Sequence, residues 1–209
     1  MTEKALWGFF YKIMNHYYTD NVDLISQKKQ IEFYYRNHSI SFITDHGVFS
    51  KDRVDYGSHV LLEAIEINDE KSLLDIGCGY GAMGISLKKA YPSLYVEMID
   101  INNRALSLAQ ENIRLNHLNN IISYNSYCLE EVKNSFDIII SNPPIRAGKQ
   151  VVGKIIKDSY DHLNNQGKLV IVIQKKQGAP SAKRLMEETY GFCEILKRDK
   201  GYYILCSQR

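Results

Sequence analysis

The stretch LLDIGCGYGAMG, residues 73–84, decides how the rest of the chain is interpreted. It opens with residues suited to a buried strand, and glycines at 77, 79 and 81 then let the backbone turn tightly and approach a ligand closely. A helix that begins after such a turn presents its free amides to that ligand. The stretch therefore predicts a binding site for a ribose or a phosphate group between a strand and a helix.

Strand and helix patterns alternate on both sides of this loop, which is typical of parallel strands in a doubly wound sheet. After the last helix two strands follow with only a few residues between them, around Asp199–Gly201, and that spacing permits a hairpin but no helical crossover. The predicted fold is therefore α/β, a doubly wound, seven-stranded, mostly parallel sheet with an antiparallel last strand. The expected helices are 58–67, 81–91, 103–116, 151–163 and 181–190, and the expected strands are 72–76, 95–100, 121–125, 136–141, 168–174, 193–198 and 201–206.

The N-terminal part has a different pattern. Residues 32–49, EFYYRNHSISFITDHGVF, alternate in part and pivot on Asn37 and His38, which predicts a β-hairpin that leads into a turn at Gly47. We therefore expect an N-terminal appendage with a hairpin over 1–57 and one main domain over 58–209.

Composition sets broad limits. A chain of 209 residues with 44% hydrophobic and 24% charged residues is ordinary for one globular domain with an appendage. The four cysteines form no C-x-x-C pair and the histidines have no metal-ligand spacing, so we expect reduced thiols and no metal. No signal peptide or membrane-spanning run is visible, so we expect a cytoplasmic protein without a membrane partner.

The charge is distributed unevenly. Up to Pro144 there are 13 Lys and Arg against 18 Asp and Glu, a net charge of −5, and from Ile145 onward 13 against 6, a net charge of +7. A basic run of this kind is ordinarily a solvated set of helix faces. It gains a functional meaning only if a binding site lies beside it.

Two acids flank the glycine loop. Asp75 would repel a pyrophosphate but can order the loop and face a cationic ligand, directly or through water, such as the sulfonium and ammonium of S-adenosylmethionine. Asp100, at the end of the next strand, can accept from both hydroxyls of a ribose. Alternatively, Asp75 is a buried cap of backbone amides and Asp100 a surface acid. Residues Gly79–Gly84 with Asp100 also match the nicotinamide dinucleotide pattern, so an oxidoreductase stays an alternative.

A second motif, FDIIISNPPIRAGK at 136–149, ends a buried strand in Asn142 and two prolines. Prolines lack backbone donors, so this tip offers hydrogen-bond acceptors only. In a doubly wound sheet it lies beside the glycine loop, where ligands bind. The Asn142 side-chain oxygen and the Pro143 carbonyl can accept the two N–H bonds of an exocyclic amine, which frees the nitrogen lone pair to attack a methyl group. Asn142, Pro143 and Pro144 are the predicted catalytic residues.

Together, DIGCGYG and the acid after the second strand resemble class I S-adenosylmethionine-dependent methyltransferases, whose last strand is also antiparallel. The resemblance implies S-adenosylmethionine as cofactor. In that family an acid or amide after the third strand often contacts the adenine, and here Tyr127 aligns with it, with Asn125 and Ser126 as further candidates. The cofactor-binding residues that the resemblance implies are Asp75, Gly77, Cys78, Gly79, Gly81, Asp100, Ile101, Asn125, Tyr127 and Asn142.

The NPP motif resembles that of amino methyltransferases acting on adenine N6, guanine N2 or a protein glutamine amide. Adenine and glutamine enzymes usually carry an aromatic residue next, where this chain has Ile145. From about His16 onward, and most strongly in NPPIRAGK, GVFSKDRVDYGS (47–58) and QKKQGAPSAKRL (174–185), the chain resembles bacterial 16S ribosomal RNA guanine-N2 methyltransferases of the small-domain methyltransferase family. Longer members carry two methyltransferase-like halves, and this chain corresponds to the catalytic half.

That resemblance implies further contacts. Asp55 and Gly57 are expected to help close the cofactor pocket, and Ser58 is either near the methyl donor or a plain helix N-cap. Phe49 packs on a base or, preferably, on the hairpin. We expect Ile145, Arg146 and Lys149 to contact the substrate, and basic residues of the last third to contact phosphates: Arg146, Lys149, Lys175, Lys176, Lys183 and Arg184.

The predicted function is methyl transfer to an exocyclic base amine of RNA, with guanine N2 of 16S ribosomal RNA as the best match. Adenine N6 or a protein glutamine amide is the alternative target, and outside this class a non-catalytic module that binds the cofactor or RNA. The oligomeric state is left open.

Overall fold

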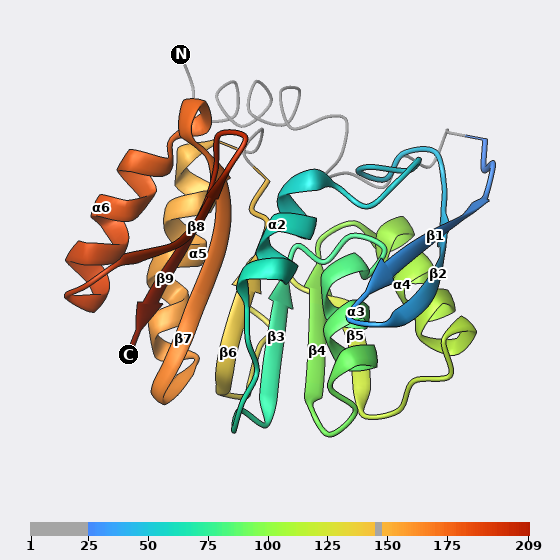
Figure 1. Cartoon of the computed structure of the whole chain (residues 1–209), viewed down its shortest axis with the longest axis horizontal. Helices are drawn as coiled ribbons and strands as arrows, with labels where there is room; N and C mark the ends of the chain where they lie inside the picture. The colour runs from blue at the N-terminus through green and yellow to red at the C-terminus, as the bar shows by residue number, and fades with distance from the viewer. Residues whose placement is uncertain (1–24, 145–147) are drawn as a thin grey trace, which may run out of the picture.

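The computed structural model describes residues 25–144 and 148–209 and contains a seven-stranded sheet of order β5-β4-β3-β6-β7-β9-β8 (Figure 1). Strands β3 to β7 pair in parallel, whereas β9 runs antiparallel to both of its neighbours, β7 and β8. The predicted doubly wound sheet with an antiparallel last strand is confirmed. Its strands are β3 (Ser72–Ile76), β4 (Tyr95–Asp100), β5 (Ile121–Asn125), β6 (Phe136–Ser141), β7 (Leu163–Gln174), β8 (Glu194–Asp199) and β9 (Tyr202–Gln208).

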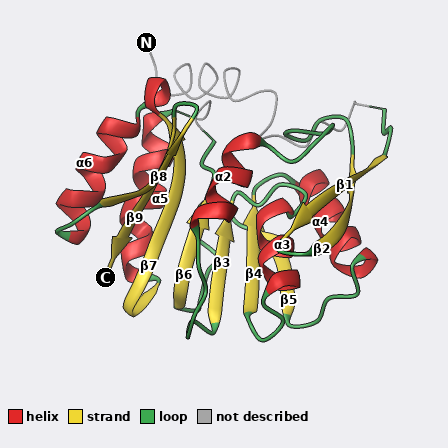
Figure 2. Cartoon of the chain, in the orientation of Figure 1, coloured by secondary structure: helices red, strands yellow, loops and turns green. Residues whose placement is uncertain are grey.

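Helices cover both faces of this sheet (Figure 2). Neighbouring strand residues point to opposite faces, so Leu73 packs in the core with α2 and α3 while Leu74 packs in the core with α5 and α6. Both leucines are fully buried, as expected for a parallel sheet covered on both sides. The helices are α2 (Tyr56–Ala64), α3 (Ala82–Ala90), α4 (Asn103–Leu115), α5 (Lys149–Asp161) and α6 (Ala179–Tyr190), with a short 3-10 helix η2 (Lys175–Gln177) after β7.

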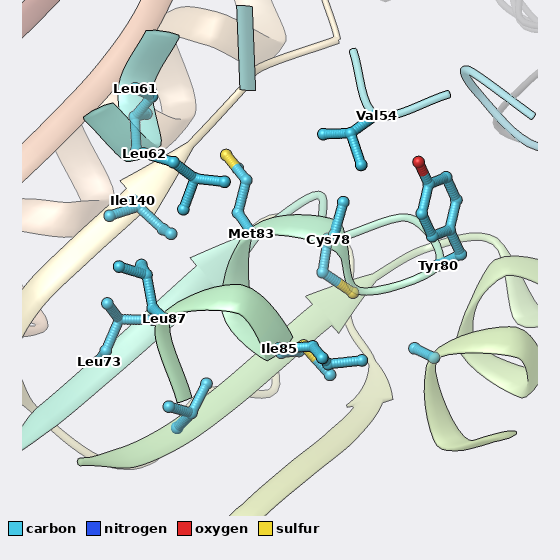
Figure 3. Close-up of a cluster of buried hydrophobic side chains, with 14 of the residues drawn as sticks. Val54, Leu61, Leu62, Leu73, Cys78, Tyr80, Met83, Ile85, Leu87 and Ile140 are labelled. Atoms are coloured by element: carbon cyan, nitrogen blue, oxygen red, sulfur yellow. The ribbon is translucent and has the colours of Figure 1, made fainter. Parts of the chain in front are cut away.

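Helix α2 is anchored on the first face of the sheet by apolar side chains. Figure 3 shows Leu61 and Leu62 of α2 next to Ile140 of β6 and Met83 of α3. Each of these side chains is almost completely buried, and burying one is worth about 1.5–3 kcal/mol. This packing fixes where the N-terminus of α2 lies relative to the tip of β6.

Among the element boundaries that differ from the prediction, two have identifiable reasons. Helix α2 begins at Tyr56, before the predicted residue 58, because the Asp55 side chain caps it by accepting from the Ser58 amide at 3.1 Å. Strand β7 begins at Leu163, before the predicted residue 168, because an irregular pairing with β6 accommodates additional residues.

The N-terminal hairpin consists of β1 (Lys29–Tyr35) and β2 (His38–Thr44), paired antiparallel. Its turn lies one residue earlier than predicted: Arg36 and Asn37 have positive φ angles of 44° and 66°, as the favoured two-residue hairpin turn requires, and His38 already pairs with Tyr35. The hairpin packs into the same core as α3 and α4. The division of the chain at residue 57 stays a prediction.

Within the described ranges, no helix is long and apolar enough to cross a membrane. In the same ranges, no three His, Cys, Asp or Glu side chains are grouped so that they could hold a metal ion.

Candidate active site

The carboxyl ends of β3, β4, β6 and β7 border a cavity of about 370 Å³. Strand β3 pairs with β4 on one side and with β6 on the other, so the cavity lies where the strand order reverses, the usual ligand position in such sheets. Its volume is in the range of roughly 300–1,000 Å³ that small-molecule sites occupy.

The glycine loop forms one wall of this cavity. Gly77 and Gly79 line it with positive φ angles of 70° and 58°, and a Cβ on either would meet no atom within 4 Å, so open space lies directly beside the backbone. Gly81 does not line the cavity. A Cβ at Gly81 would lie 2.7 Å from Cδ1 of Ile85. Gly81 is also the residue directly before α3, and its φ angle is positive, at 93°. Gly81 is therefore needed for the turn and for packing, while Gly77 and Gly79 leave room for a ligand.

Asp100 holds the loop together from the end of β4. Its carboxylate accepts from the amide of Gly79 at 2.8 Å and from the amide of Asn102 at 2.9 Å. Burial raises the pKa of Asp100, and these amide bonds oppose the increase. Asp100 and Ile101 also line the cavity. Because a carboxylate has about four acceptor positions, Asp100 keeps capacity for a ligand.

Asp75 lies behind the loop and does not line the cavity. Its side chain is fully buried: one oxygen accepts from the Gly84 amide at 2.9 Å, and the other, Oδ1, has no partner. Burial raises the pKa of Asp75 to about 7. The carboxylate therefore orders the first turn of α3, as the predicted alternative of a buried cap describes.

The last residue of β5 and the two residues after it are the three adenine-contact candidates, and two of them line the cavity. Tyr127 lines it with 38% of its surface exposed, and Ser126 lines it with its hydroxyl donating to the Cys128 carbonyl at 2.9 Å. Asn125 does not line the cavity, because its amide donates to the Ile101 carbonyl at 2.8 Å and so braces the chain after β4.

The tip of β6 forms the opposite wall, where Asn142, Pro143 and Pro144 all line the cavity. The Asn142 side-chain nitrogen donates to Oδ2 of Asp55 at 2.9 Å and to Oγ of Ser58 at 3.0 Å, both at the start of α2. Asp55 and Ser58 also line the cavity.

Gly57 lies between these two residues but does not line the cavity. A Cβ on it would lie 2.8 Å from Cε1 of Tyr202 and 3.0 Å from Oδ2 of Asp55. A side chain at this position would therefore push the Tyr202 ring or the Asp55 carboxylate away.

The remaining predicted residues lie in different places or outside the described ranges. Phe49 lines it and is 56% exposed, and Cys78 lines it from the glycine loop, where burial raises the pKa of its thiol. Lys149 is exposed at the first residue of α5 and does not line the cavity. Ile145 and Arg146 lie outside the described residues.

Several lining residues were missed by the sequence analysis. Most are apolar and cannot be told from core residues by pattern. Gln174 and Gln177 were detectable, because they follow a predicted parallel strand whose carboxyl end belongs at this edge. The missed residues are Val48, Ser50, Ile76, Tyr80, Ala82, Met83, Ile99, Asn102, Ala105, Cys128, Val151, Ile155, Gln174, Gln177 and Tyr202.

The residues present fit S-adenosylmethionine. The open backbone beside Gly77 and Gly79 admits a ligand, Asp100 has free acceptor positions for a ribose, and Oδ1 of Asp75 is a buried polar atom without a partner behind the loop. With a seven-stranded sheet whose strand β9 is antiparallel, this fold and site define a class I S-adenosylmethionine-dependent methyltransferase.

Comparison with known proteins narrows this class. The model of the methyltransferase small domain family matches residues 39–206. The uncharacterized protein YbxB of Bacillus subtilis (strain 168) is 42% identical over 197 residues, which cover 93% of this chain and 98% of that protein. The chain belongs to the methyltransferase small domain family.

Two further similarities concern longer proteins. Ribosomal RNA small subunit methyltransferase C of Salmonella arizonae is 31% identical over 173 residues, 79% of this chain and 49% of that protein, so the chain spans about half its length. The structure of the T. thermophilus 16S rRNA N2 G1207 methyltransferase, in complex with AdoMet and guanosine, matches with a TM-score of 0.80 and 24% identity over 89% of this chain and 52% of that one. The second similarity shows the shared fold.

Proposed function

We propose that this methyltransferase transfers its methyl group to an exocyclic base amine of RNA, namely guanine N2 of 16S ribosomal RNA. The observation that carries the proposal is the tip of β6, where an asparagine and two prolines line the same cavity as the glycine loop and Asp100. The names of the Salmonella and T. thermophilus proteins support ribosomal RNA as the substrate and guanine N2 as the target.

The cofactor side of the cavity holds the methyl donor in this proposal. Asp100 would accept from the ribose hydroxyls, the backbone of Gly77 and Gly79 would face the ligand, and Ser126 and Tyr127 would contact the adenine. Asp75 acts indirectly, by ordering the loop through the Gly84 amide. When bound, S-adenosylmethionine supplies a methyl group activated by its sulfonium.

At the β6 side the protein holds the target amine. Oδ1 of Asn142 and the Pro143 carbonyl accept its two N–H bonds, which favours a pyramidal nitrogen whose lone pair faces the methyl group. The surrounding apolar side chains, among them Met83 and Ile155, exclude water, so these acceptors are stronger than they would be in solution. The product loses its proton readily, so no strong base is required.

The mouth suits an RNA base that has been flipped out of its helix. Phe49 is an exposed aromatic ring that lines the cavity and offers a face for stacking. Exposed Lys149, Lys175 and Lys176 form no ion pair with an acid among the described residues, and we infer that they contact phosphates. Lys183 instead pairs with Glu187.

The predicted substrate contacts of Ile145, Arg146 and Arg184 and the cytoplasmic location stay predictions. A non-catalytic role is disfavoured because the glycine loop and the acceptor-only tip of β6 line the same cavity, so the residues for cofactor binding and for holding the target amine are both present. An adenine or glutamine amide target stays the alternative because the same tip accepts from any NH₂ group.

The test is Asn142→Ala, assayed with labelled S-adenosylmethionine and unmethylated 16S ribosomal RNA. We expect methyl transfer to fall at least about 100-fold while cofactor affinity stays within about twofold, because the change removes an acceptor used at the reacting amine. Asn119→Ala is the control, since Asn119 is exposed at the opposite end of the sheet, before β5. Nucleoside mass analysis identifies the product, and methyladenine, or methylation of a glutamine peptide alone, would overturn the assignment to guanine.

A further inference from the structure

The side-chain amide of Asn142 has its orientation determined by a neighbouring carboxylate. The atom facing Oδ2 of Asp55 at 2.9 Å must be the nitrogen, because an ionised carboxylate can only accept a hydrogen bond. The second N–H of the same nitrogen is used by Oγ of Ser58 at 3.0 Å. With both N–H bonds occupied, the side-chain amide of Asn142 can offer only its oxygen to a ligand.

The start of α2 keeps this carboxylate in place. Oδ2 of Asp55 also accepts from the backbone amide of Ser58 at 3.1 Å as the N-cap of the helix. The position of Gly57 has no room for a side chain, because a Cβ would approach both Oδ2 of Asp55 and the ring of Tyr202. Ser58 is itself only 6% exposed. One helix end therefore fixes both acceptors that face Asn142.

The carboxylate that accepts from the Asn142 side-chain nitrogen also affects how strongly the side-chain oxygen of Asn142 accepts hydrogen bonds. Hydrogen bonds in a chain polarise one another, so a carboxylate that pulls on the amide protons makes the amide oxygen a stronger acceptor. In the opposite orientation, the oxygen of Asn142 would face the carboxylate, and its NH₂ group would face an amine that also needs to donate.

We propose that Asp55 and Ser58 are positioning residues that lock the amide of Asn142 with its oxygen toward the target amine. The proposal deepens and rests on the proposed function, because it assigns the orientation that methyl transfer to an amine needs. It differs from the sequence-based expectation for Asp55, in which that residue only helps to close the cofactor pocket.

Two single substitutions test the lock. Ser58→Ala removes one of the two acceptors, and Asp55→Asn keeps an N-cap acceptor but allows the Asn142 amide to turn over. We expect kcat to fall about 10-fold in each variant, with cofactor Kd and KM for RNA within about twofold. Asp52→Asn is the matched control because Asp52 is an exposed acid in the same segment that pairs with Lys29, and it should leave kcat unchanged. A fall in cofactor affinity with unchanged kcat would overturn the proposal.

A reciprocal exchange separates positioning from helix capping. In Asn142→Asp, two carboxylates face each other and activity should be lost. Adding Asp55→Asn restores a donor opposite the new carboxylate, so the double variant should recover at least about 10-fold over Asn142→Asp alone. A residue that only caps α2 predicts no such rescue, and an absence of rescue in a double variant with the wild-type unfolding temperature would overturn the lock.

NMR of the Asn142 side-chain NH₂ group distinguishes failure of the lock from failure of the proposed function, because it needs no substrate. Both protons should exchange slowly with solvent in the wild-type protein and rapidly in Ser58→Ala. If the protons are protected but RNA is not methylated, the proposed function is wrong and the lock stands. If they exchange freely in the wild-type protein, the lock is wrong.

Discussion

The two walls of the active-site cavity are held together over very different sequence distances. On the cofactor wall, Asp75 accepts from Gly84 and Asp100 from Gly79 and Asn102, all within one β-α-β unit. On the β6 wall, Asn142 depends on Asp55 and Ser58, which lie 87 and 84 residues away. The first wall depends on contacts within one local unit, whereas the second depends on the packing of α2 against the sheet. Changes on the first wall should therefore alter binding and loop stability, and changes on the second should alter the rate.

The largest effect that would sharpen this contrast is expected at Asp100. Asp100→Ala removes the acceptor for the amides of Gly79 and Asn102 and, in the proposed function, for the ribose of the cofactor, so cofactor affinity should fall by more than about 100-fold, or ~3 kcal/mol, as measured by calorimetry. Exposed Asp69→Ala should change nothing. If cofactor affinity were unchanged in Asp100→Ala, the cofactor wall would not be the part of the cavity that determines cofactor binding, and the contrast with the β6 wall would be wrong.

A second substitution tests whether the cofactor wall also depends on contacts with residues outside its own β-α-β unit. Fully buried Asn112 of α4 accepts from the amide of Ile43 at 2.6 Å and donates to the carbonyls of Ile43 at 3.0 Å and Tyr80 at 2.9 Å, so it ties the hairpin to the glycine loop. Asn112→Ala leaves these backbone groups unpaired and should destabilise the protein by about 3 kcal/mol in denaturant unfolding. Exposed Gln110→Ala on the same helix is the control. A loss below about 1 kcal/mol would show that the loop needs no support from the hairpin.

The third effect is a pH dependence that belongs to the cofactor wall. The pKa of Asp75 is raised to about 7 in the folded protein from 3.8, so between these values the folded state holds a proton that the unfolded chain has lost. Its contribution to stability is complete below 3.8 and is lost as pH rises through about 7. From pH 5 to 8, the unfolding free energy of the wild type should therefore fall by about 2–3 kcal/mol relative to Asp75→Asn. Parallel pH profiles would show that Asp75 is ionised throughout.

The smallest effect concerns the mouth beside the β6 wall and depends on the proposed RNA substrate. Lys175→Gln with Lys176→Gln should weaken RNA binding about 3- to 10-fold at low salt and reduce the slope of log K against log salt by about 1–2, because each lost phosphate contact removes about 0.7–0.9 from the slope. Lys133→Gln with Lys157→Gln removes the same charge from exposed positions away from the mouth. Equal losses in both pairs would mean that only net charge matters.

Much of the site was predictable because its chemistry is local. Gly77 and Gly79 have the positive φ angles that glycine allows, and the prolines after Asn142 offer only acceptors wherever they lie. Asp75 and Asn125 are different, since the structure places neither in the cavity lining. The sequence correctly places Asp75 and Asn125 at or near the ends of strands. The direction in which a side chain points at a strand end, however, depends on the residues that pack around it.

The sequence by itself determined the order of strands and helices, the antiparallel last strand, the glycine loop and the acceptor-only tip, because hydrophobic period, glycine and proline act over a few residues. Only the tertiary structure decided that Asp55 and Ser58 hold Asn142 and that Asp75 is buried behind the loop. The physical reason is distance along the chain. A hydrogen bond between residues 87 apart exists only after the apolar face of α2 has packed on the sheet, and no local pattern encodes where that face comes to rest.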